Sequence, residues 1–194
     1  MSSSMGQLEE MLSVVGDEAG DEVDWAAAER AYGVHFPPDY KRFVARFGGG
    51  TIEGSIGILI PIETADPMIR RVYRLLDSVR EDPDLQRWSG VEGVTPSLGD
   101  VLIWGDTDSA DFIGWLTIGE NSETWPLVVY SRVKASWTAY GCSMSEFLAG
   151  ILSGEFSECP ISDESLMGAG RSRFLHDREE ERLLEMGVYP WEEE

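Results

Sequence analysis

Basic residues are scarce in this sequence of 194 residues, where 15 lysines and arginines stand against 36 aspartates and glutamates, a formal net charge of −21. A chain with so little positive charge lacks the basic face that holds nucleic-acid phosphates, and anionic lipid headgroups would repel it. No uncharged apolar run approaches the roughly 18 residues of a membrane-spanning helix. Residues 1–24 contain no Lys or Arg, unlike a secretory signal. We therefore expect a cytoplasmic protein that binds neither nucleic acid nor membrane.

Cysteine and histidine are also scarce, and this limits the chemistry that the chain can perform. Cys142, Cys159, His35 and His176 do not occur at the C-x-x-C or H-x-x-x-H spacings of metal sites. Phosphate-loop, zinc-protease and nucleophile-elbow motifs are missing from the sequence. His35 is expected to form local hydrogen bonds in a turn, and a Cys142–His35 dyad stays open although nothing marks the thiol as activated. We predict no catalytic residues, no metal and no cofactor, and thus a protein that is not an enzyme.

Helical periodicity and capping residues recur along most of the chain, whose length favours one domain. Helices are predicted at 4–15, 25–32, 37–47, 66–80, 144–153 and 177–186. The helix after residue 143 has the clearest start, because Ser143 and Glu146 form a capping-box pattern.

Runs of β-branched and aromatic residues predict strands at 56–62, 101–104, 112–118 and 127–130. Short polar connections between the last three allow hairpins but no crossover helices, which indicates an antiparallel meander. The strand at 112–118 is apolar on both faces and should be central, with helices packed over it. We predict an α+β fold with an antiparallel-rich, mixed sheet. The predicted organisation is an N-terminal helix and acidic linker (1–22), an α+β domain (23–154) and an acidic C-terminal extension with a short helix (155–194).

The densest polar cluster lies between the strands at 101–104 and 112–118 and contains Asp106, Asp108 and Asp111. A calcium loop starting at Asp106 would need other residues at its fifth, sixth and twelfth positions, which are Ala110, Asp111 and Thr117. The cluster is therefore better explained as a solvated hairpin loop with Asp turn chemistry than as a metal site.

Two tryptophans, Trp104 and Trp115, flank this hairpin. Large rings of this kind usually belong to a core, and an anchor in a protein interface is the alternative. Because the surrounding surface is acidic, a basic protein would be attracted to it. We predict a protein-binding site, and its residues are Trp104, Asp106, Asp108, Asp111 and Trp115.

Three groups of residues together resemble a known family. A proline-started amphipathic helix at 36–43 leads to three glycines at 48–50, the runs 102–115 and 125–129 look like paired central strands, and a capped helix begins after 143. Their order and spacing over residues 23–154 are similar to the SUKH superfamily, which includes fungal cell-wall assembly regulators and many bacterial immunity proteins. Phe36 replaces the more usual leucine and Gly48 the more usual asparagine.

The resemblance implies an α+β fold and a binding role in place of catalysis. Many bacterial members are thought to neutralise polymorphic toxins, often nucleases, by binding the toxin domain. We therefore expect an immunity protein whose partner is a basic protein, the cognate toxin domain. The alternative is a regulatory scaffold of the cell-wall assembly type that docks signalling partners.

Overall fold

The computed structural model describes residues 4–61, 71–89 and 96–191. Its helices are α1 (Ser4–Met11), α2 (Trp25–Tyr32), α3 (Pro38–Arg46), α4 (Asp77–Arg80), α5 (Met144–Ser153) and α6 (Asp177–Glu185). Its strands are β1 (Leu12–Val15), β2 (Gly50–Ile52), β3 (Ile56–Ile58), β4 (Tyr73–Arg74), β5 (Trp88–Ser89), β6 (Val101–Thr107), β7 (Phe112–Leu116), β8 (Leu127–Ser131), β9 (Ser136–Tyr140) and β10 (Ser172–His176). Short 3₁₀ helices occur at Pro83–Leu85, Leu98–Asp100 and Ser122–Thr124.

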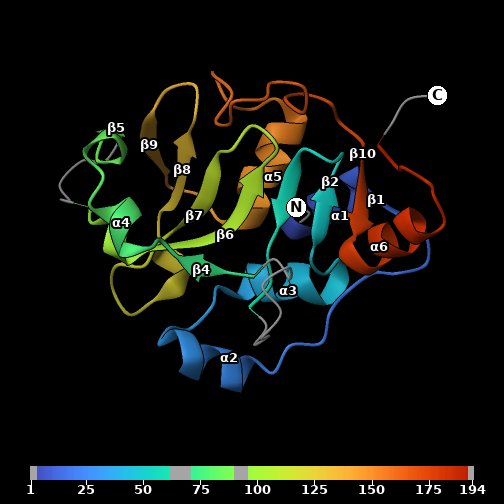
Figure 1. Ribbon diagram of the computed structural model, residues 1–194, viewed down its shortest axis with the longest axis horizontal. Helices are drawn as coiled ribbons and strands as arrows, with labels where there is room; N and C mark the ends of the chain where they lie inside the picture. Colours follow the sequence, from blue (N-terminus) through green and yellow to red (C-terminus); the bar gives the residue numbers. More distant parts are fainter. Residues whose placement is uncertain (1–3, 62–70, 90–95, 192–194) are drawn as a thin grey trace.

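All of these strands belong to one sheet in the order β1-β10-β2-β3-β6-β7-β8-β9-β5, with β4 paired to β6 (Figure 1). Neighbours are antiparallel except for the parallel pairs β1–β10 and β5–β9. The predicted α+β class with a mixed, antiparallel-rich sheet is confirmed. The predicted meander is also confirmed, as β6–β7–β8, and β9 extends it.

Helices α1, α3 and α5 pack against one another, and α5 lies behind the strands in Figure 1. The buried side of β7 meets α3 through aromatic rings, since Tyr40 lies edge-on to Trp115 at 5.0 Å between centroids and Phe36 also contacts Trp115. Further along, Phe43 of α3 lies edge-on to Phe174 of β10. The aromatic residues of the proline-started helix thus form the core between helix and sheet.

The opposite face of the sheet is aromatic too. Phe112, Tyr130 and Trp137 occupy paired positions on β7, β8 and β9, and Trp88 of β5 stacks on Trp137 with 5.5 Å between ring centroids. Strand β7 is therefore apolar on both faces and lies between β6 and β8, which confirms its predicted central position.

Helices with clear caps form where the sequence predicts them. The Asp24 side chain accepts a hydrogen bond from the Ala27 N–H at the start of α2, and Gly33 ends the helix with a left-handed φ of 67°. Ser143 and Glu146 form the predicted capping box of α5, which ends at Gly154. Both ends of each helix are thus satisfied locally, so the sequence alone is enough to place them.

Two helix predictions are wrong in part. The helix predicted at 4–15 ends at Met11, because residues 12–15 form strand β1 beside β10. The helix predicted at 66–80 forms only at its end, as α4 (Asp77–Arg80), while residues 71–76 are extended and β4 pairs with β6; residues 66–70 lie outside the described part of the chain. In both segments pairing with the sheet overrides a helical spacing of apolar residues.

The two ends of the chain meet in the sheet. Strand β1 runs parallel to β10, with Leu12 opposite Ser172 and Val15 opposite Leu175, and β10 runs antiparallel to β2. Neither β1 nor β10 is among the strands predicted from the sequence. Backbone hydrogen bonds therefore extend the sheet beyond residues 23–154 into both terminal segments.

Candidate functional site

The hairpin tip, defined as residues 106–111, joins β6 to β7 at the upper edge of the sheet in Figure 1. Asp106 and Thr107 lie at the end of β6, so the turn is shorter than predicted. The Thr107 N–H donates to the Asp111 carbonyl at 3.2 Å, and Ala110 takes a left-handed φ of 62° to close the turn.

Asp111 is fully buried and serves as the anchor of this tip. Its carboxylate accepts hydrogen bonds from the Thr107 hydroxyl (3.0 Å), the Arg132 N–H (2.7 Å), and the N–H and hydroxyl of Ser162 (2.6 and 2.5 Å). A buried carboxylate is stable only when such donors replace the water that it loses. Asp111 thus joins the hairpin tip to the β8–β9 turn and to the segment after α5.

Two further carboxylates, those of Asp163 and Asp108, lie beside the buried hydroxyl of Ser55. Ser55 donates at 2.9 Å to Asp163 and lies 3.5 Å from a carboxylate oxygen of Asp108. Asp163 also accepts from the N–H and hydroxyl of Ser165, and these bonds lower the pKa of its carboxyl. Asp108 itself is exposed, and Asp106 is half-buried.

The five residues predicted to bind a partner therefore fall into two groups. The side chains of Trp104, Trp115 and Asp111 are at most 2% exposed, and the centroids of the two indole rings lie 5.6 Å apart. They support the fold from inside, while Asp106 and Asp108 reach the surface, where a binding role stays a prediction. Ser55, Ser162 and Asp163, which hold the tip, were missed because nothing in their local sequence marks contacts with residues between 51 and 108 positions away.

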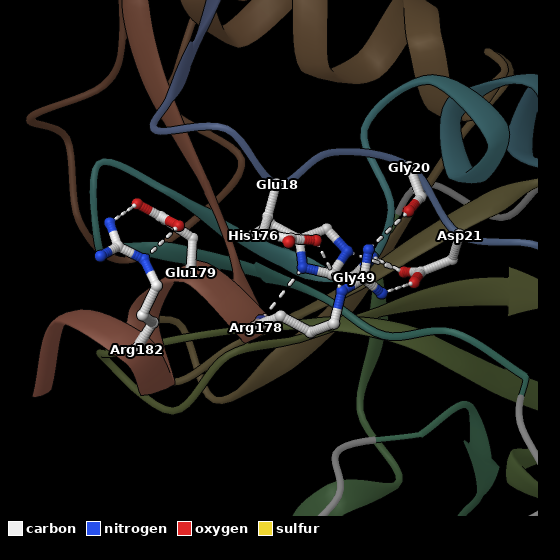
Figure 2. A network of polar contacts seen from close by, with 8 residues as sticks. All are labelled: Glu18, Gly20, Asp21, Gly49, His176, Arg178, Glu179 and Arg182. Carbon is white, nitrogen blue, oxygen red and sulfur yellow. Dashed lines mark hydrogen bonds and ion pairs between the residues drawn. The ribbon is translucent and has the colours of Figure 1, made fainter. Parts of the chain in front are cut away.

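A second polar network ties the N-terminal segment to the start of α6 (Figure 2). The His176 ring is buried, its Nε2 lies 3.1 Å from a carboxylate oxygen of Asp21, and its Nδ1 accepts from the Arg178 N–H. An Nδ1 that accepts leaves the ring proton on Nε2, where it donates to Asp21. Both ring nitrogens are thus committed, and His176 has no free nitrogen for proton transfer to a substrate.

Asp21 is the centre of this network, because it also accepts from the Gly49 N–H and from Arg178. Burial by itself raises the pKa of Asp21, but the bonds from His176, Gly49 and Arg178 outweigh burial and lower the pKa to about 2. Arg178 also bonds Glu18, and Arg182 bonds the buried carboxylate of Glu179. The network therefore holds the segment around residue 21 against β10 and α6.

The remaining candidates for acid–base or thiol chemistry are not activated. Burial raises the pKa of the Cys142 thiol to about 12, with Glu146 and Asp39 adding to the effect, and burial also raises the pKa of Cys159. His35 is 81% exposed and its Nδ1 lies 3.1 Å from Glu29. Within the described residues no contact joins Cys142 to His35.

A polar cleft of about 690 Å³ lies between the end of α2 and the loop after β7. Its lining includes the cationic Arg74 and the carboxylates of Asp100 and Glu120. Burial lowers the pKa of Arg74, whose guanidinium donates to the Gly99 carbonyl and the Thr117 hydroxyl. With both signs of charge on its walls, the cleft does not select a ligand of one charge.

In the described part of the chain, no helix has the length and hydropathy to cross a membrane. Among the same residues, no three His, Cys, Asp or Glu side chains are placed to hold a metal ion.

Comparison with protein families identifies the chain. A family model described as SMI1-KNR4 cell-wall, SUKH_6, matches residues 22–148. Searches of curated proteins and of solved structures found no significant match. The matched region covers well over half of the chain, from just before α2 into α5. The chain therefore belongs to the SMI1-KNR4 (SUKH) family, and the resemblance inferred from its motifs is confirmed.

Proposed function

We propose that this SUKH protein is a non-catalytic immunity protein that neutralises a toxin domain by binding it directly. The family match over residues 22–148 carries the proposal, because the SUKH group includes immunity proteins of this kind. The partner's chemistry follows from charge. A chain of net charge −21 attracts basic proteins over several ångströms and accelerates their encounter.

A nuclease toxin fits this charge. Enzymes that grip nucleic-acid phosphates carry lysines and arginines on the face that meets the nucleic acid. A carboxylate-rich protein that covers such a face would compete with the substrate for the same cations. The proposed partner is therefore a basic toxin domain, bound in a stoichiometric complex.

The environments of His176 and Cys142, two side chains that could take part in catalysis, favour a binding role over an enzymatic one. The buried His176 uses both ring nitrogens within the protein, and the Cys142 thiol has a pKa of about 12, so it carries very little thiolate at neutral pH. Neither group has the activation that acid–base or nucleophilic catalysis requires.

The test is a pull-down with the tagged, full-length chain from lysate of the cells that encode it, washed at low and then at high salt. We expect one basic protein to remain after washing at about 1 M salt, which screens exposed charges beyond roughly 3 Å. Co-expression of that protein with and without this chain then measures neutralisation through cell growth. A retained partner whose toxicity is unaffected by the chain would contradict the proposal.

A regulatory scaffold is the second candidate, favoured by the cell-wall description of the family. A scaffold would retain several partners weakly and lose them as salt is raised. Deleting residues 155–194 is a poor way to separate the two functions, because the deletion removes β10 and the Ser162 partner of Asp111. Surface substitutions in the intact chain are the appropriate variants.

A further inference from the structure

Exposed large apolar side chains are concentrated at the end of α6. In the described residues, four of the six such side chains lie within six consecutive positions: Leu184 (47% exposed), Met186 (64%), Val188 (45%) and Tyr189 (59%). We call residues 184–189 the C-terminal apolar patch. Single exposed apolar residues are common, but four of them within six positions make this segment a candidate interaction surface.

The patch is held in a defined conformation. Gly187 ends α6 with a left-handed φ of 73°, and the Val188 N–H donates to the Leu183 carbonyl at 2.9 Å. Beyond the patch, Trp191 packs against Gly54, donates its indole N–H to Glu180 at 3.2 Å and lies under the Arg173 guanidinium. Figure 1 shows this end of the chain running from α6 up beside β10. The surface is therefore preorganised, which lowers the entropy cost of binding.

The charge around the patch is negative. Both arginines of α6 are bound within the protein, Arg178 to Glu18 and Asp21 and Arg182 to Glu179. Glu181 and Glu185 are exposed, and neither has an ion pair within the part of the chain that the structure describes. Their charges are therefore available to an incoming cation.

We propose that the C-terminal apolar patch docks a protein whose contact surface has an apolar centre and a rim of lysines and arginines. The proposal rests on the proposed function for its choice of a basic protein, and it assigns the contact to a surface outside the family region at 22–148. A second copy of this chain would place like charges against each other. An anionic membrane would meet the same repulsion from Glu181 and Glu185.

The test compares two variants that lose exposed apolar groups at different places. The patch variant is Leu184→Ser/Met186→Ser/Tyr189→Ser, and its control is Leu76→Ser/Val133→Ser, whose two side chains are 71% and 78% exposed. The probe is the basic protein that the wild-type chain retains through high salt, identified by mass spectrometry and purified. We expect the patch variant to bind it at least about tenfold more weakly, and the control to stay within about twofold of wild type.

Three other outcomes would contradict the proposal, and each points to a different explanation. Wild-type affinity in the patch variant would place the contact elsewhere and leave the proposed function standing. A dimer of the isolated chain that the patch variant abolishes in sedimentation would make a second copy the occupant. If wild type retains no basic protein, the proposed function fails and the docking proposal fails with it.

A second variant protects the test against misfolding. Glu181→Lys/Glu185→Lys changes only exposed side chains and places cations at the rim of the patch. We expect it to weaken binding of the same purified protein by at least about tenfold, mainly through slower association. Unchanged affinity in this variant would contradict the proposed basic rim of the partner.

Discussion

The hairpin tip and the end of α6 are both rich in acidic residues, but their carboxylates differ in burial and in hydrogen bonding. Asp111 is buried, and its carboxylate accepts four hydrogen bonds from groups within the protein. Glu181 and Glu185 are exposed and unpaired among the described residues, beside four exposed apolar side chains. The Asp111 carboxylate thus holds three loops together, whereas the end of α6 exposes carboxylates and apolar side chains to solvent.

A dense acidic motif in the sequence is therefore not by itself a binding surface. In the sequence the tip is the more conspicuous cluster, because three aspartates occur within six residues. Turn chemistry and the needs of a buried junction account for one of the three in full. The patch at 184–189 has no comparable motif, and only its exposure identifies it.

Removing the buried carboxylate should have the largest effect. Asp111→Ala leaves the donors of Thr107, Arg132 and Ser162 without their acceptor, and we expect the free energy of unfolding to fall by about 3 kcal/mol or more. Asp108→Ala is the matched control at an exposed position and should change stability by less than about 0.5 kcal/mol. Denaturant unfolding measures both, and equal losses would remove the distinction between buried and exposed acids at the tip.

The Asp21 network should give a smaller, pH-dependent effect. The pKa of Asp21 is lowered from 3.8 to about 2, so its charge stabilises the folded state above the unfolded pKa, and this stability is lost as the pH falls towards 2. We expect Asp21→Asn to lower the free energy of unfolding by about 2 kcal/mol at pH 7.

The difference between wild type and Asp21→Asn should then shrink between pH 4 and pH 2, about the range between the two pKa values. Unfolding curves at several pH values measure the difference. A constant gap down to pH 2 would show that the Asp21 carboxylate is not stabilised in its charged form by His176 and Arg178.

The free carboxylates of α6 should affect the association rate constant more than the dissociation rate constant. Glu181→Gln/Glu185→Gln is expected to slow association with the basic partner by about threefold to tenfold at low salt and to have little effect at high salt. Stopped-flow or surface-based kinetics would detect the change. A slower association that persists at high salt would argue for direct contacts and against electrostatic steering.

The smallest effect is expected at the surface of the hairpin tip. Asp106→Asn/Asp108→Asn removes two charges far from α6 in sequence, and we expect its affinity for the same partner to stay within about threefold of wild type. A loss as large as that of the patch variant would return the binding site to the tip, as the sequence predicts.

Elements with local signals could be predicted from the sequence, and elements set by distant pairing could not. The caps at Asp24, Gly33 and Ser143 place α2 and α5 because they satisfy helix ends within a few residues. Leu12 continues the apolar spacing of α1, and only its pairing with Ser172, 160 residues away, makes it part of a strand. Such pairing leaves no trace in a short window of sequence.

The same reasoning explains what could be predicted of the candidate site. The sequence identifies the hairpin and its acids, but the burial of Asp111 depends on Ser162 and Arg132, which reach it from other parts of the chain. In the sequence, Tyr73 and Leu76 fit the apolar stripe of a helix. In the structure β4 pairs with β6 instead, and Leu76 is 71% exposed. Exposure is a property of the assembled fold, so the choice between core and surface could not be made beforehand.

Hydrogen–deuterium exchange on the full-length chain, alone and in complex with the purified basic partner, tests the central comparison most directly. Amides that become buried in an interface exchange more slowly. We expect slower exchange in the complex at residues 180–191 and unchanged exchange at residues 106–111. Protection at 106–111 with no change at 180–191 would contradict a partner contact at the end of α6.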